Sequence, residues 1–199
     1  MTVVLIVIGL VVVLGLIYIL IRNSMIGARN RVDEAWSGID VQLRRRASLV
    51  PNLVETVRGY AAHERGVFDE VARARGALHQ AGGAAAAAGA NTALSQALGH
   101  LLAVAEAYPQ LRASETFTGL QRDLGDAEDK IAFARQFYNR NVLDFNTRVE
   151  SFPGNLIAST LRFLPAEYFE TADEGRAEVT VGFSAAPRER TTETSPPSP

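Results

Sequence analysis

The chain begins with an apolar run that extends from Val3 to Ile21 and contains no charged side chain. As an α-helix this run would be about 29 Å long, which matches the hydrocarbon thickness of a bilayer. The free energy of inserting its valine, leucine and isoleucine side chains into a membrane is favourable by on the order of several kcal/mol. The pattern therefore predicts a transmembrane helix over residues 1–22.

A cleaved signal peptide is the alternative interpretation of this run. Signal peptides carry a basic segment before a shorter apolar core and end at small residues that a peptidase recognises. Here only the α-amino group precedes the run, and Arg22, Asn23, Ser24 and Met25 follow it. These flanks favour an anchor that stays in the mature protein.

Beyond the anchor, apolar positions recur at helical spacing over most of residues 23–170. A first stripe runs from Val32 to Leu43 with spacings of four and three, which place its members on one face of a helix. Pro51 interrupts the pattern, so that either Ser48 caps a new helix or Pro51 kinks a continuing one. The apolar stripe then continues over residues 53–78, which we expect to form one helix.

The rest of this domain predicts further long helices. The Ala- and Gly-rich segment 76–90 is expected to be a loop or frayed helix ends, because glycine weakens helices. A third helix is predicted over 94–105, a long fourth one from Ser114 to about 152, and a short one over 155–163. The fold class is therefore all-α: one N-terminal transmembrane helix followed by an elongated antiparallel bundle of long helices.

Residues 171–199 form an acidic tail that is rich in Pro, Ser and Thr. Residues 184–199 consist mostly of Pro, Ser, Thr and charged residues, which cannot bury enough apolar surface to offset the entropy of ordering, so this part of the tail is predicted to be disordered. Alternating apolar positions over 177–183 predict one short strand before it.

Arginines cluster on the C-terminal side of the anchor. Arg22, Arg29 and Arg31 follow it most closely, and we expect them to contact the anionic membrane surface. The positive-inside rule then places the N-terminus outside and the bundle in the cytoplasm, at the cytoplasmic membrane. The formal net charge of −2 is too small to predict a nucleic-acid partner.

No motif in the chain predicts catalysis, a metal site or a cofactor. The sequence contains no cysteine. His63 and Glu64 begin like the helix motif of zinc proteases, but Val67 stands where the second histidine ligand would be. His79 and His100 lie at unrelated spacings. We therefore expect a protein that is not an enzyme.

Polar residues interrupt the apolar face of the long fourth helix. An asparagine that is buried without partners costs free energy, so this face predicts a structural hydrogen-bond network that sets helix register. A polar groove that binds a small ligand or peptide is the functional alternative, and a solvated stripe without a role is the third. The predicted network comprises Gln42, Arg45, Arg46, Asn52, Glu106, Arg135, Asn139 and Asn146.

Seven short segments follow one another along about residues 22–183. They are Asp33–Trp36, Val41–Arg46, Leu49–Val54, Ala105–Leu111, Tyr138–Asn146, Phe152–Ala158 and Tyr168–Phe169. In this order they resemble the LemA family. The resemblance implies a membrane-anchored bundle of long helices, but no established biochemical activity. Ser48 departs from it, because the family usually has aspartate at that position.

Two classes of function fit these observations. The favoured one is a non-enzymatic scaffold or adaptor, which assembles with copies of itself or presents a surface to other membrane proteins. The alternative is an accessory or regulatory subunit of a membrane peptidase or of an envelope-stress system. In both, the lipid bilayer is the expected partner, joined by a second copy of the chain or by another membrane protein.

Overall fold

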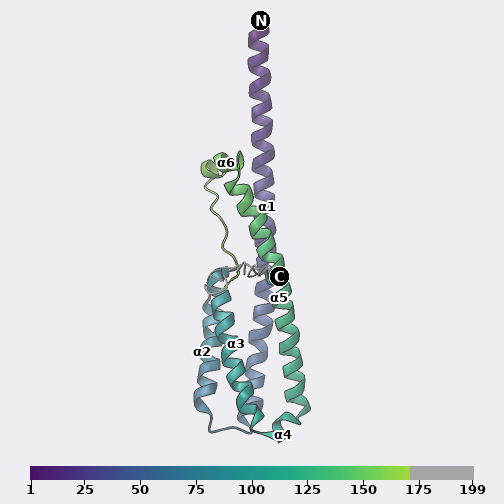
Figure 1. Cartoon of the computed structure of the whole chain (residues 1–199), viewed down its shortest axis with the longest axis vertical. Helices are drawn as coiled ribbons and strands as arrows, with labels where there is room; N and C mark the ends of the chain where they lie inside the picture. The colour runs from purple at the N-terminus through teal and green to yellow at the C-terminus, as the bar shows by residue number, and fades with distance from the viewer. Residues whose placement is uncertain (171–199) are drawn as a thin grey trace, which may run out of the picture.

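The computed structural model describes residues 1–170, which form six helices and contain no strand (Figure 1). The predicted all-α fold is confirmed: an elongated antiparallel bundle lies behind one long apolar N-terminal helix. The predicted tail and the predicted strand over 177–183 lie outside the described residues. The helices are α1 (Thr2–Arg58), α2 (Arg65–Gln80), α3 (Ala84–Glu106), α4 (Pro109–Arg112), α5 (Glu115–Glu150) and α6 (Gly154–Leu161).

Helix α1 connects the apolar run to the bundle without a break. It has 57 residues and is therefore about 86 Å long. Pro51 lies inside it, and the Ser48 hydroxyl donates a hydrogen bond to the carbonyl of Arg45 instead of capping a new helix. Among the described residues, α1 is the helix that is long and apolar enough to cross a bilayer. The anchor and the first bundle helix are thus one rod.

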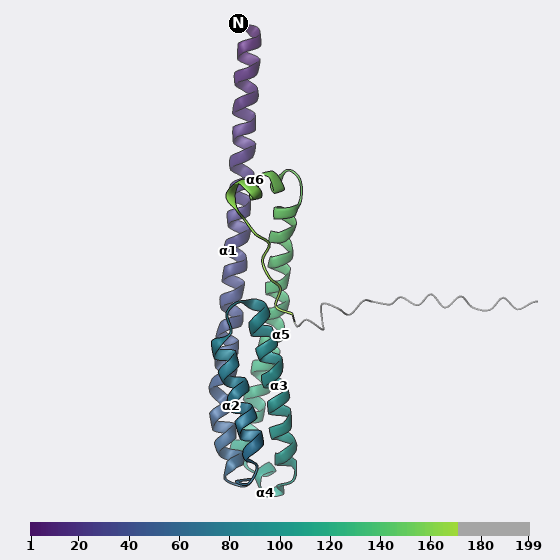
Figure 2. The same ribbon diagram turned by 90° about the vertical axis from the view of Figure 1, so that its left-hand side faces the viewer.

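The bundle consists of two antiparallel helix pairs. Helix α5, with 36 residues, packs along α1, while α2 packs along α3. Figure 2 shows that the α2–α3 hairpin covers only the half of the bundle far from the N-terminus. Nearer the N-terminus, α1 and α5 are joined by α6 and by the extended segment 163–170, which returns toward the hairpin.

The prediction of one helix over 53–78 is wrong. Helix α1 ends at Arg58, residues 59–64 form a turn, and α2 begins at Arg65 in the opposite direction. Val57 and Val71 both have fully buried side chains. Both helices bury their apolar faces in one shared core. In the sequence, the apolar positions of α1 and α2 therefore look like one continuous helical stripe.

The prediction that 76–90 is a loop or frayed helix ends, and not a packed element, is also wrong. Helix α2 continues to Gln80 and α3 already starts at Ala84. Alanine is the best helix former, and its small side chain lets helices approach closely; Ala84, Ala87 and Ala88 are buried. Of the glycines, Gly83 occupies the turn with φ = 91°, a backbone conformation that side chains with a Cβ rarely adopt.

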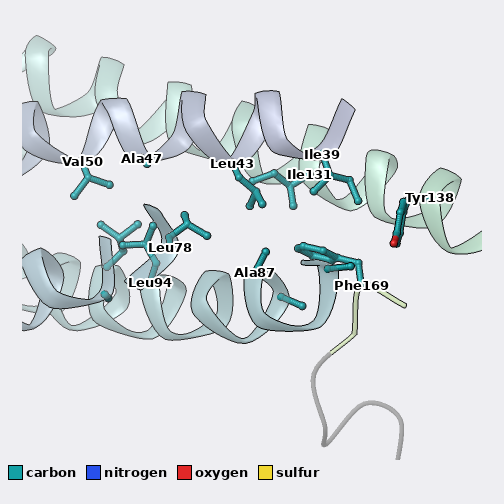
Figure 3. Packing of buried hydrophobic residues seen from close by; sticks show 14 of the residues in the cluster. Ile39, Leu43, Ala47, Val50, Leu78, Ala87, Leu94, Ile131, Tyr138 and Phe169 are labelled. Atoms are coloured by element: carbon teal, nitrogen blue, oxygen red, sulfur yellow. The ribbon is translucent and has the colours of Figure 1, made fainter. Parts of the chain in front are cut away.

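The apolar core runs along the contact of α1 with the other helices. Phe169, from the extended segment, closes it at the end of the α2–α3 hairpin and is 3% exposed. Core side chains of four helices converge in Figure 3, with Ile39, Leu43, Ala47 and Val50 from α1, Leu78 from α2, Ala87 and Leu94 from α3, and Ile131 and Tyr138 from α5.

Candidate functional site

Arg46 is the one predicted network residue that crosses the bundle core. Its side chain leaves α1, is 3% exposed, and binds Glu128 of α5 at 2.6 Å. It also donates to Asn91 at 2.6 Å and to Ser95 at 3.0 Å, both on α3. Burial lowers the pKa of Arg46, and the attraction of Glu128 opposes this only in part. The cluster joins three helices through one buried charge.

Asn146 and Asn139 bind the main chain of the extended segment. The Asn146 amide accepts a hydrogen bond from Ala166 N at 2.8 Å and donates one to Ala166 O at 3.0 Å. Asn139 accepts from Phe169 N at 2.9 Å and donates to Phe169 O at 3.4 Å. Glu170 lies beside Asn139, with its Oε1 3.3 Å from the amide nitrogen. Each asparagine thus pairs with both the N–H and the C=O of one residue, as a residue of a neighbouring antiparallel strand would.

Tyr138 adds a third attachment between α5 and this segment. Its hydroxyl donates to the carbonyl oxygen of Glu167 at 2.8 Å. Burial, and then the charge of Glu167, raises the pKa of Tyr138, so the hydroxyl keeps the proton that it donates. The rings of Trp36 and Tyr138 lie 5.8 Å apart, and those of Trp36 and Phe169 lie 6.3 Å apart. The attachment therefore combines polar and aromatic contacts.

The other predicted network residues differ in burial. Arg45, Asn52 and Glu106 are exposed, and Arg135 is half-buried. Gln42 is half-buried, and its side-chain oxygen is buried without a hydrogen-bond partner among the described residues. The structure therefore brings the predicted residues into separate groups, and it does not join Asn139 and Asn146 to the arginines of α1.

The three arginines predicted to contact the membrane differ in their partners. Arg22 is exposed directly after the apolar run. Arg29 pairs with Asp33 at 3.3 Å, and Arg31 pairs across the bundle with Asp144 of α5 at 2.8 Å. Contact of these arginines with lipid headgroups stays a prediction.

Asp144 lies at the centre of the polar contacts near the anchor. Arg148 donates to it from the same helix, at 3.0 Å and 3.1 Å, and also binds the hydroxyl of Ser24 on α1. Hydrogen bonds from Arg148 and then from Arg31 lower the pKa of Asp144. These groups hold the end of α5 against α1.

A groove of about 650 Å³ lies between α1 and α5. Trp36 and Leu43 of α1 line a separate cavity with Leu78 of α2, so the groove is on the side of α1 that faces away from the α2–α3 hairpin. Its lining combines acidic and aromatic side chains with small ones: Glu34, Ala35, Gly38 and Gln42 from α1, and Asp126, Asp129, Lys130, Phe133, Ala134 and Phe137 from α5.

Two phenylalanines of this groove are exposed, although they are large and apolar. Phe133 is 74% exposed and Phe137 is 54% exposed. They are not among the residues predicted from the sequence to form a site. A signal in the sequence could have found them. They are four residues apart, so they lie on one face of α5, and this face differs from the buried one that carries Ile131 and Tyr138.

The described residues contain no group of three or more His, Asp or Glu side chains placed to hold a metal ion. The arrangement that they do form is a long rod with one exposed aromatic groove. Such a surface binds other apolar surfaces. We therefore take the groove of α1 and α5 as the candidate functional site.

Comparison with known proteins identifies the family. The LemA family model matches residues 35–183. Magnetosome protein MamQ 2 of Paramagnetospirillum magneticum is 28% identical and MamQ of Magnetospirillum gryphiswaldense 26%, each over 77% of this chain and 66% of the relative. Protein LemA of Metamycoplasma hominis is 21% identical over 82% of this chain and 75% of the relative. The chain thus spans about two thirds of the length of the MamQ relatives, and it belongs to the LemA family.

Proposed function

We propose that this protein is a non-enzymatic scaffold, anchored in the membrane by α1, whose bundles assemble side by side through the groove of α1 and α5. The observation that carries the proposal is the pair of exposed rings, Phe133 and Phe137, in that groove. Full burial of one phenylalanine contributes about 1.5–3 kcal/mol, so covering both rings supplies a substantial driving force for association.

The anchor determines which surfaces of two copies can meet. When α1 crosses the bilayer, every copy has the same orientation, so residues at the same distance from the membrane lie opposite each other. Phe133 lines the same groove as Gly38 of α1, and Ala87 of α3 lines the same cavity as Asp40 and Leu43 of α1. The groove and the start of α3 are therefore at the same level, on opposite sides of the bundle.

The surface of α3 at this level suits a head-to-tail contact. Its exposed positions carry small, uncharged residues at Ala85, Ala86, Gly89 and Ala93. A surface of small side chains leaves room for the two protruding phenylalanine rings of a neighbouring copy. A contact between two different surfaces of one chain repeats into a ring or a filament.

The charges of the groove oppose the alternative, a two-fold contact of the groove with itself. Glu34, Asp126 and Asp129 line it together with one cation, Lys130. In a two-fold contact between copies of the same orientation, these acids would face each other, and like charges in contact destabilise an interface. The groove therefore favours the uncharged α3 surface over a second groove.

The orientation in the membrane is tested by single cysteines, since the chain has none of its own. We propose that the N-terminus lies outside and the bundle in the cytoplasm, because the arginines follow the apolar run. In intact cells, Thr2→Cys should react with a membrane-impermeant thiol reagent, whereas Gln110→Cys on α4 should react only after lysis. Labelling of Gln110→Cys in intact cells would reverse the proposed orientation.

The head-to-tail contact is tested by crosslinking of two single-cysteine variants. When chains with Lys130→Cys and chains with Ala86→Cys share a membrane, a short thiol-to-thiol crosslinker should join them into dimers. Each variant alone should give far fewer dimers. The double substitution Phe133→Ser/Phe137→Ser in the Lys130→Cys chain should reduce crosslinking several-fold, because it removes the apolar contact.

Tyr60→Ser provides the matched control, since Tyr60 is also exposed, at 45%, but lies in the turn after α1. It should leave crosslinking unchanged. Crosslinks of Lys130→Cys with itself would indicate the two-fold contact instead. Purification of the full chain with a second protein at fixed stoichiometry, and without crosslinks between copies, would favour the accessory or regulatory subunit of a membrane enzyme.

A further inference from the structure

The connection between α5 and α6 forms an uncharged, apolar corner. Between Glu150 and Arg162 the chain has no charged residue. Phe152 is 80% exposed and Leu156 is 61% exposed, and Leu164, just after α6, is 75% exposed. Large apolar side chains so fully exposed on one corner of a bundle indicate a surface that contacts something other than water.

This corner lies at the end of the apolar run of α1. Figures 1 and 2 show α6 beside α1 where the free N-terminal part of the helix begins. Phe152 and Pro153 line a cavity of about 330 Å³ together with Leu20, Ile21 and Met25 of α1. The exposed apolar surface of the anchor is thus continuous with that of the corner.

The dimensions of the bilayer place the corner at its surface. The run from Val3 to Ile21 is about 29 Å long as a helix, and the hydrocarbon core of a bilayer is about 30 Å thick. When α1 spans the membrane, one edge of the hydrocarbon therefore lies near Leu20 and Ile21. Phe152, which shares a cavity with both residues, lies at the same level.

The corner is held firmly against α1. Gly154, Ile157 and Ala158 face the bundle and are buried. A Cβ at Gly154 would overlap the carbonyl oxygen of Arg148 and lie 3.0 Å from Met25 Cε, so glycine is what permits this close approach. With one side of α6 packed in this way, Leu156 faces outward.

We propose that the α5–α6 corner is a second membrane contact, which inserts Phe152 and Leu156 into the boundary between lipid headgroups and acyl chains. This proposal rests on the proposed anchoring by α1. Phenylalanine and leucine on an uncharged surface suit the acyl boundary, while the exposed cations Arg22, next to Ile21, and Arg162, directly after α6, suit lipid phosphates. The two contacts together fix the angle between the bundle and the membrane, since a single helix can tilt.

The test uses tryptophan fluorescence of the full chain in phospholipid vesicles. Trp36 is the only tryptophan, so each reporter is placed in a Trp36→Phe background. Phe152→Trp should show blue-shifted emission and strong quenching by lipids brominated near the headgroup. Phe133→Trp, in the groove, should be quenched several-fold less. Leu156→Trp serves as a second reporter of the corner, should Phe152→Trp disturb the fold.

Leu10→Trp reports on the anchor separately, because it should be quenched by lipids brominated deep in the acyl chains. Quenching of Leu10→Trp without quenching of either corner variant would overturn the second contact and leave the anchoring intact. Absence of quenching at Leu10→Trp as well would overturn both the anchoring and the inference that rests on it.

Discussion

Glu128→Gln is expected to lower the free energy of unfolding by about 2–4 kcal/mol, because it removes the carboxylate from a buried guanidinium. Arg46 is 3% exposed, and Glu128 is its acidic partner at 2.6 Å. Removal of one partner of a buried pair leaves the other charge uncompensated, which costs about 3–5 kcal/mol. The lower range applies here because the Glu128 side chain is 51% exposed, and solvent screens part of the interaction.

Arg46→Met tests how the free-energy cost of burying the guanidinium compares with the stabilisation that its ion pair with Glu128 provides. Methionine fills much of the same volume without a charge, and the half-exposed Glu128 is left facing water. Replacement of a buried charged group by an apolar side chain of similar volume is often neutral or stabilising, so this variant should be near neutral or more stable than the parent chain. Chemical denaturation of the full chain in detergent measures both variants. A larger loss for Arg46→Met than for Glu128→Gln would contradict this account.

Asn146→Leu is expected to lower the free energy of unfolding by about 2–4 kcal/mol, because it removes two hydrogen bonds and leaves the N–H and C=O of the half-buried Ala166 without their partner. Asn146 itself is 8% exposed, so little water reaches this side of the segment. Hydrogen exchange at the amide of Ala166 should become much faster than in the parent chain. Unchanged protection there would show that the asparagine does not hold the segment.

Asn146→Asp should behave differently from Asn146→Leu as the pH changes. A protonated carboxyl group can donate to Ala166 O and accept from Ala166 N, as the amide does. The ionised form would instead place a buried charge against Ala166 O, so folding raises the pKa of the introduced group. Stability is then fully present below the pKa of the unfolded chain and is lost as the pH rises through the higher folded pKa.

Denaturation at about pH 4 and about pH 7 tests this, with the parent chain measured at each pH. The parent is needed because hydrogen bonds from Arg148 lower the pKa of Asp144, so the stability that this group contributes is itself lost as the pH falls. Relative to the parent, Asn146→Asp should be close to neutral at the acid pH and clearly destabilised at pH 7. The same deficit at both pH values would exclude the amide-like role of the carboxyl group.

Periodicity predicted those parts of the fold that depend on local pattern. The apolar run of α1 and the apolar stripe of α5 extend over many helical turns. Each can be identified from the side chains of one helix alone, without knowledge of the neighbouring helices. The same reasoning failed between Leu53 and Ala90. In this stretch, consecutive helices bury their apolar faces in the same core, and alanines contribute to that core. Neither the spacing nor the size of the apolar residues therefore shows where a helix ends and a turn begins.

The predicted asparagine face shows where sequence reasoning reached its limit. Its spacing placed Asn139 and Asn146 together, but their partners are main-chain groups of 166–169, an extended segment without a pattern of its own. Likewise, the spacing of Phe133 and Phe137 places them outside the buried face of α5, but the groove that they line depends on how α5 packs along α1.

Side-chain chemistry along single helices was enough to predict the all-α class and the long apolar helix, while the resemblance of short motifs indicated the LemA family. Helix packing was needed to show that Arg46 crosses the core, that the asparagines pair with main-chain groups, and that a groove and an apolar corner are exposed. The physical reason is that a hydrogen-bond partner, or the cover of an apolar side chain, comes from a segment distant in sequence. Its position is set by the packing of whole helices and not by local spacing.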